Sequence, residues 1–267
     1  MIKPNPMLRT IVLTLGYAFL YVPILCLMVF SFNDSAMITS WTGFSFRWYG
    51  ELFQDQALLS AARLSLLIAA MTATAAVIIG TWAGYVLARM GRFPGFALYI
   101  GLVSAPLVIP EVVLGISLLL MFVEISQLLG WPDGNGIFTI WIGHVTLCMA
   151  YVAVIIQSRI RDLDRSLEEA ALDLGATPLK VFFVITLPLI FPALLAAWLL
   201  AFTLSLDDVV VASFLSGPGY TTLPLEVFSR VRLGLKPEIN ALATLFMLAV
   251  GIAVVIANRI HWRKRSS

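Results

Sequence analysis

Charged residues are scarce in this sequence of 267 residues: they make up 12% of it, whereas hydrophobic residues make up 60%. Soluble domains average about 25% charged and about 45–50% apolar residues. The sequence also lacks the G-x-x-x-x-G-K-[ST] loop that cradles nucleotide phosphates. These two shortages exclude an ordinary soluble domain. They also predict that the chain is not an enzyme and has no ATP site of its own.

Cysteine and histidine are also rare, with two of each. Cys26 and Cys148 both lie in apolar runs and lack the paired spacing typical of metal sites, so we expect small buried side chains and no metal centre. His144 is alone in a long apolar run. An interhelical hydrogen bond is its ordinary role in such a place, and a proton relay is the alternative.

Long apolar runs are what the sequence has in abundance. A helix needs about 20 predominantly apolar residues to cross a bilayer, because every backbone polar group must find its partner within the segment. The runs do not alternate in polarity, which excludes a β-barrel. We predict an all-α membrane protein, a single transmembrane domain with a bundle of six spans. The expected spans are residues 10–32, 64–87, 96–123, 137–157, 188–206 and 240–260.

The basic residues are unevenly divided between the two sides of this predicted bundle. The side that holds both termini carries 12 of the 17 Lys and Arg residues and five of the acids, and the other side carries five basic and ten acidic residues. Basic residues near span ends stay in the cytoplasm. We therefore expect both termini to be cytoplasmic, and an acidic outer side that attracts cations.

The longest cytoplasmic connection, between the fourth and fifth spans, contains helix signals. Ser166 followed by Glu169 has the spacing of a capping box, and Gly175 is placed to end the helix that it starts. Thr177 before Pro178 is a second start signal, because proline suits the first helical position. The connection is therefore expected to fold as helix, turn, helix. Without further information, an amphipathic loop resting on the membrane surface would also explain it.

This connection, residues 159–187, resembles the EAA loop of binding-protein-dependent (type I) ABC importer permeases. It reads E-A-A-x3-G from Glu169 to Gly175 and I-x-L-P from Ile185 to Pro188. The resemblance implies the permease fold, with cytoplasmic coupling helices that sit in a groove of a separate ATPase. The residues that it implies for this contact are Glu168, Glu169, Ala170, Ala171 and Gly175.

Three acids lie in suggestive positions within the spans, where ionisable groups are costly and point to function. Glu111 follows Pro106 and Pro110, each of which removes a backbone donor and helps to open the helix. Asp207 and Asp208 are adjacent at the end of the fifth span. Adjacent carboxylates favour a cationic guest, so we expect these three residues to line the substrate pathway. The alternatives are that Asp208 caps a re-entrant helix and that Glu111 bonds to a neighbouring span.

Basic residues, by contrast, are missing from the depths of the predicted spans. A path for sulfate or phosphate would lack the donors it needs, so an amine cargo fits better. Tyr220, Trp41 and Trp48 carry aromatic rings that suit cation–π contact with an ammonium group, and we count Tyr220 with the three acids among the expected substrate-pathway residues. Their more ordinary role is to pack or to anchor the outer face.

Most of the chain resembles polyamine permeases, and the segment from Gly175 to Pro188 is closest to the putrescine branch. The resemblance implies a bacterial inner-membrane location and four kinds of partner: a second, related permease, a homodimeric ATP-binding subunit that holds ATP and Mg, a periplasmic polyamine-binding protein, and membrane lipid. No nucleic acid is implied. The segments that carry the likeness are FRWYGELF (46–53), PLVIPEVVLGIS (106–117), LSLDDVVVASF (204–214), GPGYTTLP (217–224) and KPEINALAT (236–244).

Two other functions remain open from the residues alone. An ABC permease for ferric iron or another cation would also use acidic residues. An ion-coupled secondary transporter would show internally repeated halves with broken helices at matching positions, and the sequence has no such repeat.

Overall fold

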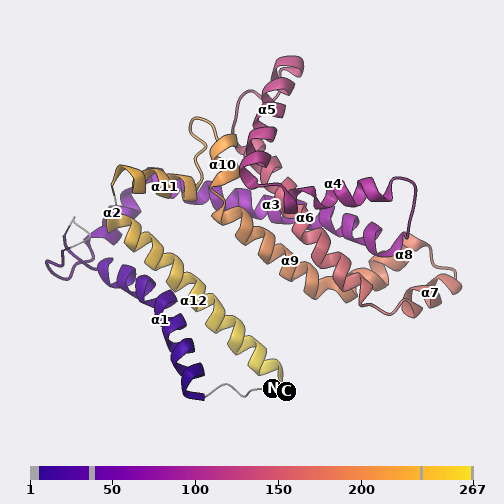
Figure 1. Cartoon of the computed structure of the whole chain (residues 1–267), viewed down its shortest axis with the longest axis horizontal. Helices are drawn as coiled ribbons and strands as arrows, with labels where there is room; N and C mark the ends of the chain where they lie inside the picture. Colours follow the sequence, from indigo (N-terminus) through magenta and orange to yellow (C-terminus); the bar gives the residue numbers. More distant parts are fainter. Residues whose placement is uncertain (1–5, 36–39, 235–236, 266–267) are drawn as a thin grey trace. The chain divides into compact units, whose positions relative to one another are not determined.

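The computed structural model describes residues 6–35, 40–234 and 237–265. Lys236, in the last of the resembling segments, lies outside the described residues. The described backbone is helical, with one isolated β-bridge between Asn33 and Phe44. The chain divides into two compact units, Met1–Leu59 with Val227–Ser267 and Ser60–Glu226 (Figure 1).

The first unit pairs helices from the two ends of the chain. Helix α12 (Pro237–Arg265) packs along α1 (Pro6–Phe30) and against the short helix α2 (Arg47–Gln54) (Figure 1). Trp48 on α2 is only 4% exposed, and its indole Nε1 donates a hydrogen bond to the carbonyl of Asn33 over 2.6 Å. Trp48 is therefore a core residue of this unit, in agreement with a packing role, and the cation over its ring is the guanidinium of Arg47, 5.0 Å from the ring centroid.

The second unit contains most of the helices and the candidate site. Its central helix, α6, is buried along most of its length and packs against α4, α9 and α10. Helix α3 begins in the first unit, and helix α11 ends there. The elements are α3 (Gln56–Arg89), α4 (Phe96–Val108), α5 (Glu111–Leu129), α6 (Ile137–Arg161), α7 (Ser166–Asp173), α8 (Pro178–Val181), the π-helical turn η1 (Phe182–Thr186), α9 (Leu187–Asp207), α10 (Val210–Leu215) and α11 (Leu223–Leu233).

Glycine brings α3 into close contact with α6. A Cβ atom at Gly80 would lie 2.7 Å from Cβ of Val152, and one at Gly84 would lie 2.7 Å from the carbonyl oxygen of Ala153. The two glycines are four residues apart, so they occupy one face of α3, the small-residue arrangement that lets membrane helices approach closely. Cys148 is buried on α6, whereas Cys26 is exposed on α1, contrary to the expectation that both are buried.

The predicted third span is interrupted. Residues 96–123 were expected to form one helix, but α4 ends at Val108 and α5 begins at Glu111. Pro110 has no N–H to continue the α4 ladder, and it holds the backbone between the two helices extended, with a ψ of 136°. The opening of the helix that the two prolines indicated occurs at Pro110 as a complete break, whereas Pro106 lies inside α4.

The other expected spans correspond to longer helices. Residues 10–32, 64–87, 137–157, 188–206 and 240–260 correspond to α1, α3, α6, α9 and α12 in turn. Among the described residues, five helices have the length and apolar composition to cross a membrane: α1, α3, α5, α6 and the continuous helix from Pro178 to Asp207. Helix α4 (Phe96–Val108) and the first part of α12 (Pro237–Ile252) are shorter apolar helical segments. A count of six spans is therefore approximate.

The connection after α6 folds as helix, turn, helix, with one change at its start. The expected capping box is not formed: Ser166 lies inside α7, and its backbone N–H donates to the Asp164 carboxylate over 2.9 Å, which lowers the pKa of Asp164. At the other end, Gly175 adopts a φ of 85°, and hydrogen bonds from Gly175 to Leu172 and from Ala176 to Ala171 close the helix.

Thr177 begins the second helix as expected, because its side chain accepts a hydrogen bond from the Lys180 N–H. This helix does not end before the fifth span. It continues from α8 through η1 directly into α9, so the connection is continuous with the membrane helix on its C-terminal side.

An ion pair fixes the corner of the first unit where α3 begins. Asp55 precedes α3 and accepts a hydrogen bond from the Leu58 N–H over 3.0 Å. Its carboxylate also accepts from the guanidinium of Arg230, with Nη2 and Oδ1 3.1 Å apart. This hydrogen bond from Arg230 is the main cause that lowers the pKa of Asp55 below its ordinary value. Glu238 at the start of α12 also accepts from Arg230, over 3.4 Å.

We expect Asp55→Asn to reduce the free energy of unfolding by about 2 kcal/mol at pH 7, because it weakens a helix cap and removes a charged partner of Arg230. The folded-state pKa of Asp55 is lowered, so this contribution is complete above the unfolded pKa of about 3.9 and is lost as pH falls through the folded value. Thermal unfolding in detergent across a pH series measures it. Glu51→Gln, in the exposed Arg47–Glu51 pair, is the control and should change little; an equal loss in both variants would contradict this account.

Candidate functional site

The second unit contains a pocket of about 320 Å³ that brings the three predicted acids together. Glu111 comes from the first turn of α5, Asp207 from the last residue of α9, and Asp208 from the link to α10. We call it the acidic pocket. None of the described residues that line it is basic. Its other lining residues are Leu147, Tyr151, Leu204, Val209 and Val210.

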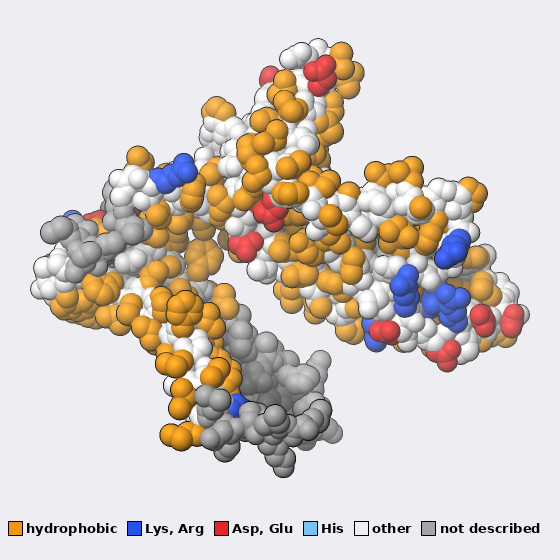
Figure 2. Space-filling view, in the orientation of Figure 1, with side chains coloured by type: hydrophobic (Ala, Val, Ile, Leu, Met, Phe, Trp, Pro, Cys, Tyr) orange, Lys and Arg blue, Asp and Glu red, His pale blue; other side chains and the backbone are white. Residues whose placement is uncertain are grey.

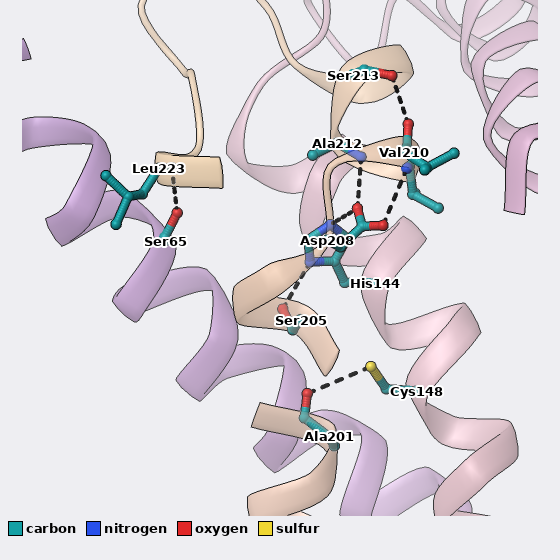
Figure 3. Close-up of polar contacts among 11 residues, drawn as sticks. Ser65, His144, Cys148, Ala201, Ser205, Asp208, Val210, Ala212, Ser213 and Leu223 are labelled. Atoms are coloured by element: carbon teal, nitrogen blue, oxygen red, sulfur yellow. Dashed lines mark hydrogen bonds and ion pairs between the residues drawn. The ribbon is translucent and has the colours of Figure 1, made fainter. Parts of the chain in front are cut away.

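Asp208 is the structural member of the three acids. It is 8% exposed, and its carboxylate accepts hydrogen bonds from the backbone N–H groups of Val211 and Ala212 at 3.3 and 2.8 Å (Figure 3). His144 Nε2 lies 3.0 Å from Oδ2 of Asp208, and Nδ1 of the same ring is 2.7 Å from the Ser205 hydroxyl (Figure 3). Asp208 therefore caps a short helix, as the alternative interpretation held. His144 has the interhelical role that its isolation in the sequence indicated.

Asp207 and Glu111 are the free acids of the acidic pocket. Both side chains are exposed, and within the described part of the chain neither forms an ion pair. Glu111 lies at a helix N-terminus, where the backbone dipoles favour negative charge, whereas Asp207 lies at a helix C-terminus, where they oppose it. A cation in the pocket would offset the unfavourable position of Asp207. Among the described residues no group of three or more His, Cys, Asp or Glu side chains is placed to hold a metal ion.

Helix α10 sets the position of the Asp208 link, and two glycines let it approach its neighbours. A Cβ atom at Gly115 of α5 would lie 2.6 Å from the ring of Phe214, and one at Gly143 of α6 would lie 2.4 Å from Leu215. Close packing of α10 on α5 and α6 therefore fixes where its first turn, and with it Asp208, can lie.

Tyr220 does not belong to the acidic pocket. It lies beyond the end of α10 and lines a separate pocket with the connection between α5 and α6. Tyr220 and the three acids therefore line different pockets, on either side of α10. The expected place of Tyr220 on the substrate pathway stays a prediction.

The predicted coupling residues lie on α7 and its closing turn. Glu169, Ala170 and Gly175 are exposed and Ala171 is half-buried. Apolar side chains nearby are also exposed, with Leu174 at 89% and Leu179 at 62%. Basic and acidic side chains gather around this end of the second unit (Figure 2). The surface has the mixed apolar and charged character of one that meets another protein.

Glu168 differs from its neighbour Glu169 because its side chain points into the protein. Oε2 of Glu168 lies 2.9 Å from Nε of Arg89, the last residue of α3, and Oε1 accepts a hydrogen bond from the Thr186 hydroxyl over 2.9 Å. The Arg89 and Glu168 side chains are 8% and 15% exposed. We call these three residues the α7 clamp, because they join α7 to α3 and to η1. The expectation that the Glu168 side chain contacts a partner is not supported by this placement.

Sequence reasoning missed the partners in both clusters. His144 is 61 residues from Ser205, and Arg89 is 79 residues from Glu168. One signal was available for the α7 clamp. Arg89 stands at the end of an apolar run, and a buried arginine in such a place needs an acidic partner close by.

Comparison with known proteins places this chain among transport proteins. Residues 76–266 match the family described as "Binding-protein-dependent transport system inner membrane component". The putrescine transport system permease protein PotI of Escherichia coli K12 is 61% identical over 249 residues, which cover 93% of this chain and 89% of that protein. The spermidine/putrescine transport system permease protein PotC of the same strain is 40% identical over 260 residues, 97% of this chain and 96% of that one.

A solved structure shares the fold. A chain of a bacterial ABC transporter involved in the import of the acidic polysaccharide alginate superimposes with a TM-score of 0.74 at 18% identity, covering 95% of each chain. The predicted fold, that of a type I ABC importer permease, is thereby confirmed.

We expect Asp208→Asn to lower the free energy of unfolding by about 2 kcal/mol, because it weakens two hydrogen bonds from backbone N–H groups and leaves His144 without a charged partner. Asp207→Asn, one residue away, should change it by no more than about 0.5 kcal/mol, because the Asp207 side chain is exposed. Thermal unfolding of the purified protein in detergent compares them. Equal stability of the two variants would show that Asp208 is not the structural acid.

Proposed function

This chain belongs to the family of binding-protein-dependent transport system inner membrane components, and from that premise we propose that it is the permease subunit of an ABC importer for polyamines, with putrescine as its cargo. The observation that carries this proposal is the acidic pocket, which sets two free carboxylates, Glu111 and Asp207, beside a third that is already paired. The names of its 61% and 40% identical relatives support the same cargo class.

Charge and shape both favour a diammonium cargo in the acidic pocket. A primary ammonium group offers three donors and one positive charge, and each free carboxylate can accept one such group. The apolar side chains of Leu147, Leu204 and Val209 line the same pocket and suit the methylene chain between two ammonium groups. Among the residues that the structure describes, none that lines the pocket is basic, so none would bind an anion there.

The energy for transport comes, in this proposal, from other subunits. The chain lacks a nucleotide-binding loop, so ATP and Mg are bound by a homodimeric ATP-binding subunit and this chain binds no cofactor. A related second permease completes the pathway, and a periplasmic polyamine-binding protein delivers the cargo. The excess of basic residues on the side of the termini supports an orientation with both termini in the cytoplasm.

Movement of the ATP-binding subunit reaches the membrane helices through α7. Glu169, Ala170, Ala171 and Gly175 form the surface that docks on that subunit. The α7 clamp then links α7 to the end of α3 and, through Thr186, to the start of the helix that carries Asp207. Because a buried ion pair resists separation, displacement of α7 would carry α3 and α9 with it and change access to the acidic pocket.

We expect Glu111→Gln and Asp207→Asn each to lower putrescine uptake by about five- to thirtyfold, which corresponds to the loss of about 1–2 kcal/mol of charge attraction. Uptake of labelled putrescine into proteoliposomes that contain the whole transporter measures this effect. Glu124→Gln is the matched control, because Glu124 is exposed on α5 and does not line the pocket. Normal uptake by both pocket variants, or equal loss in the control, would contradict the assignment.

Substitutions in the docking surface and in the α7 clamp should impair transport in different ways. Glu169→Lys should weaken co-purification of the ATP-binding subunit, because it reverses a charge on the docking surface. Arg89→Glu should keep that subunit bound but lower uptake per ATP hydrolysed by about tenfold or more, because it breaks the buried pair. Both variants are compared by co-purification and by the ratio of uptake to hydrolysis.

The exchanged pair Arg89→Glu with Glu168→Arg is the control for this prediction. It restores opposite charges at the same place and should recover at least part of the coupling. If the single variant couples normally, or if the exchanged pair is no better than the single variant, the α7 clamp does not transmit the movement.

A further inference from the structure

The second pocket of the unit Ser60–Glu226 has a volume of about 300 Å³. It is lined by the connection from Trp131 to Gly136, by the first residues of α6 and by Tyr220. We call it the aromatic pocket. Neither the substrate pathway proposed above nor the coupling of α7 uses it.

The two segments that form the aromatic pocket are locked together. Asn135 Nδ2 donates to the carbonyl of Phe214 over 3.1 Å, and the buried Thr139 hydroxyl donates to the carbonyl of Leu215 over 2.7 Å. Gly217 approaches so closely that a Cβ atom there would lie 2.0 Å from the carbonyl oxygen of Asn135. The end of α10 is therefore tied to the start of α6, and the pocket is formed before any ligand arrives.

The side chains available to a ligand in the aromatic pocket are of two kinds. Trp131 and Tyr220 supply aromatic rings, and Asp133 supplies a carboxylate that makes no ion pair within the described ranges. The ring of Tyr220 lies against Gly136, where an added Cβ would come within 3.2 Å. The lining residues that the structure describes include no basic side chain. A carboxylate beside aromatic faces is the chemistry that recognises an ammonium group.

Anchoring at the membrane surface would explain the two aromatic rings but not the whole pocket. Interfacial anchoring needs only amphipathic rings at the headgroup level. A carboxylate in the same pocket adds nothing to that role and repels anionic headgroups. The combination with Asp133 therefore favours a cation-binding site.

The position of the aromatic pocket relative to the acidic pocket suggests its use. The acidic pocket is lined by Val209 and Val210 at the start of α10, and Tyr220 follows the end of α10 by five residues. Helix α10 has six residues and spans about 9 Å. We propose that the aromatic pocket is an entry site, which binds one ammonium group of the cargo before the cargo reaches Glu111 and Asp207. This proposal rests on the polyamine importer function proposed above.

Fluorine NMR of the complete transporter tests the entry site directly. Tryptophan is replaced throughout by 5-fluorotryptophan, and Trp131→Phe identifies the resonance of Trp131 by its disappearance. Putrescine should shift that resonance with a saturable dependence on concentration. The uncharged isostere 1,4-butanediol should not shift it, because it lacks the ammonium groups.

Variants of Asp133 and Tyr220 should change the putrescine concentration that half-saturates this shift. Asp133→Asn should raise the half-saturating putrescine concentration about five- to thirtyfold, and Tyr220→Leu should raise it about two- to fivefold. Tyr220→Phe keeps the ring and should change it less than twofold. Absence of the putrescine shift, an equal shift with the diol, or wild-type titration by Asp133→Asn would overturn the proposal.

The same preparation, reconstituted in proteoliposomes, separates this proposal from the proposed function. Normal putrescine uptake by the unsubstituted protein without a Trp131 shift would overturn the entry site alone. A putrescine shift at Trp131 without putrescine uptake would overturn the proposed function and leave a cation site in the aromatic pocket.

Discussion

The hydrogen-bonding needs of the backbone inside a membrane govern this structure. Hydrocarbon contains no water to satisfy an N–H or C=O group, so a membrane chain can leave the helical conformation only where something else takes up the freed groups. Two interruptions of the helices in the second unit, before Glu111 and after Asp207, show how this is done. At the first, proline removes the donor itself. At the second, the Asp208 carboxylate accepts from two backbone N–H groups of α10.

These two interruptions explain why the acids gather in one pocket. Each break exposes helix ends, and ionisable side chains are tolerated there because polar groups are already present. Asp208 serves the fold, and His144 and Ser205 hold its carboxylate in place (Figure 3). That arrangement leaves Asp207 and Glu111 without ion-pair partners among the described residues. Of the two adjacent aspartates, Asp208 is therefore structural and Asp207 is available to a cation.

Two of the three local helix signals were read correctly, and the third, the capping box of Ser166 and Glu169, is not formed because the Ser166 N–H donates to Asp164. Thr177 begins a helix and Gly175 ends one because caps depend on neighbours within a few residues. Glu111, Asp207 and Asp208 could be expected in one region because charge inside an apolar run is costly wherever it occurs. The structure brings these three acids into one pocket.

Long-range features could not be read from one sequence. The motif predicted that Glu168 and Glu169 both lie on the docking surface. Adjacent residues on a helix point in different directions, so on α7 Glu168 is buried against Arg89 and Glu169 is exposed. Pro106 and Pro110 indicated an opening of the helix before Glu111, but the sequence could not show that the helix breaks at Pro110 while Pro106 stays inside α4. The separation of Tyr220 from the acids depends on α10, a helix of six residues that is too short to give a periodic signal.

The most direct test of this account is the structure of the complete transporter, with its ATP-binding subunits held closed by a non-hydrolysable nucleotide and with putrescine bound. The account predicts density for the diamine in the acidic pocket, with an ammonium nitrogen within hydrogen-bonding distance of the Asp207 or Glu111 carboxylate. Diamine density elsewhere along the pathway, or an acidic pocket that faces lipid in the assembled complex, would contradict it.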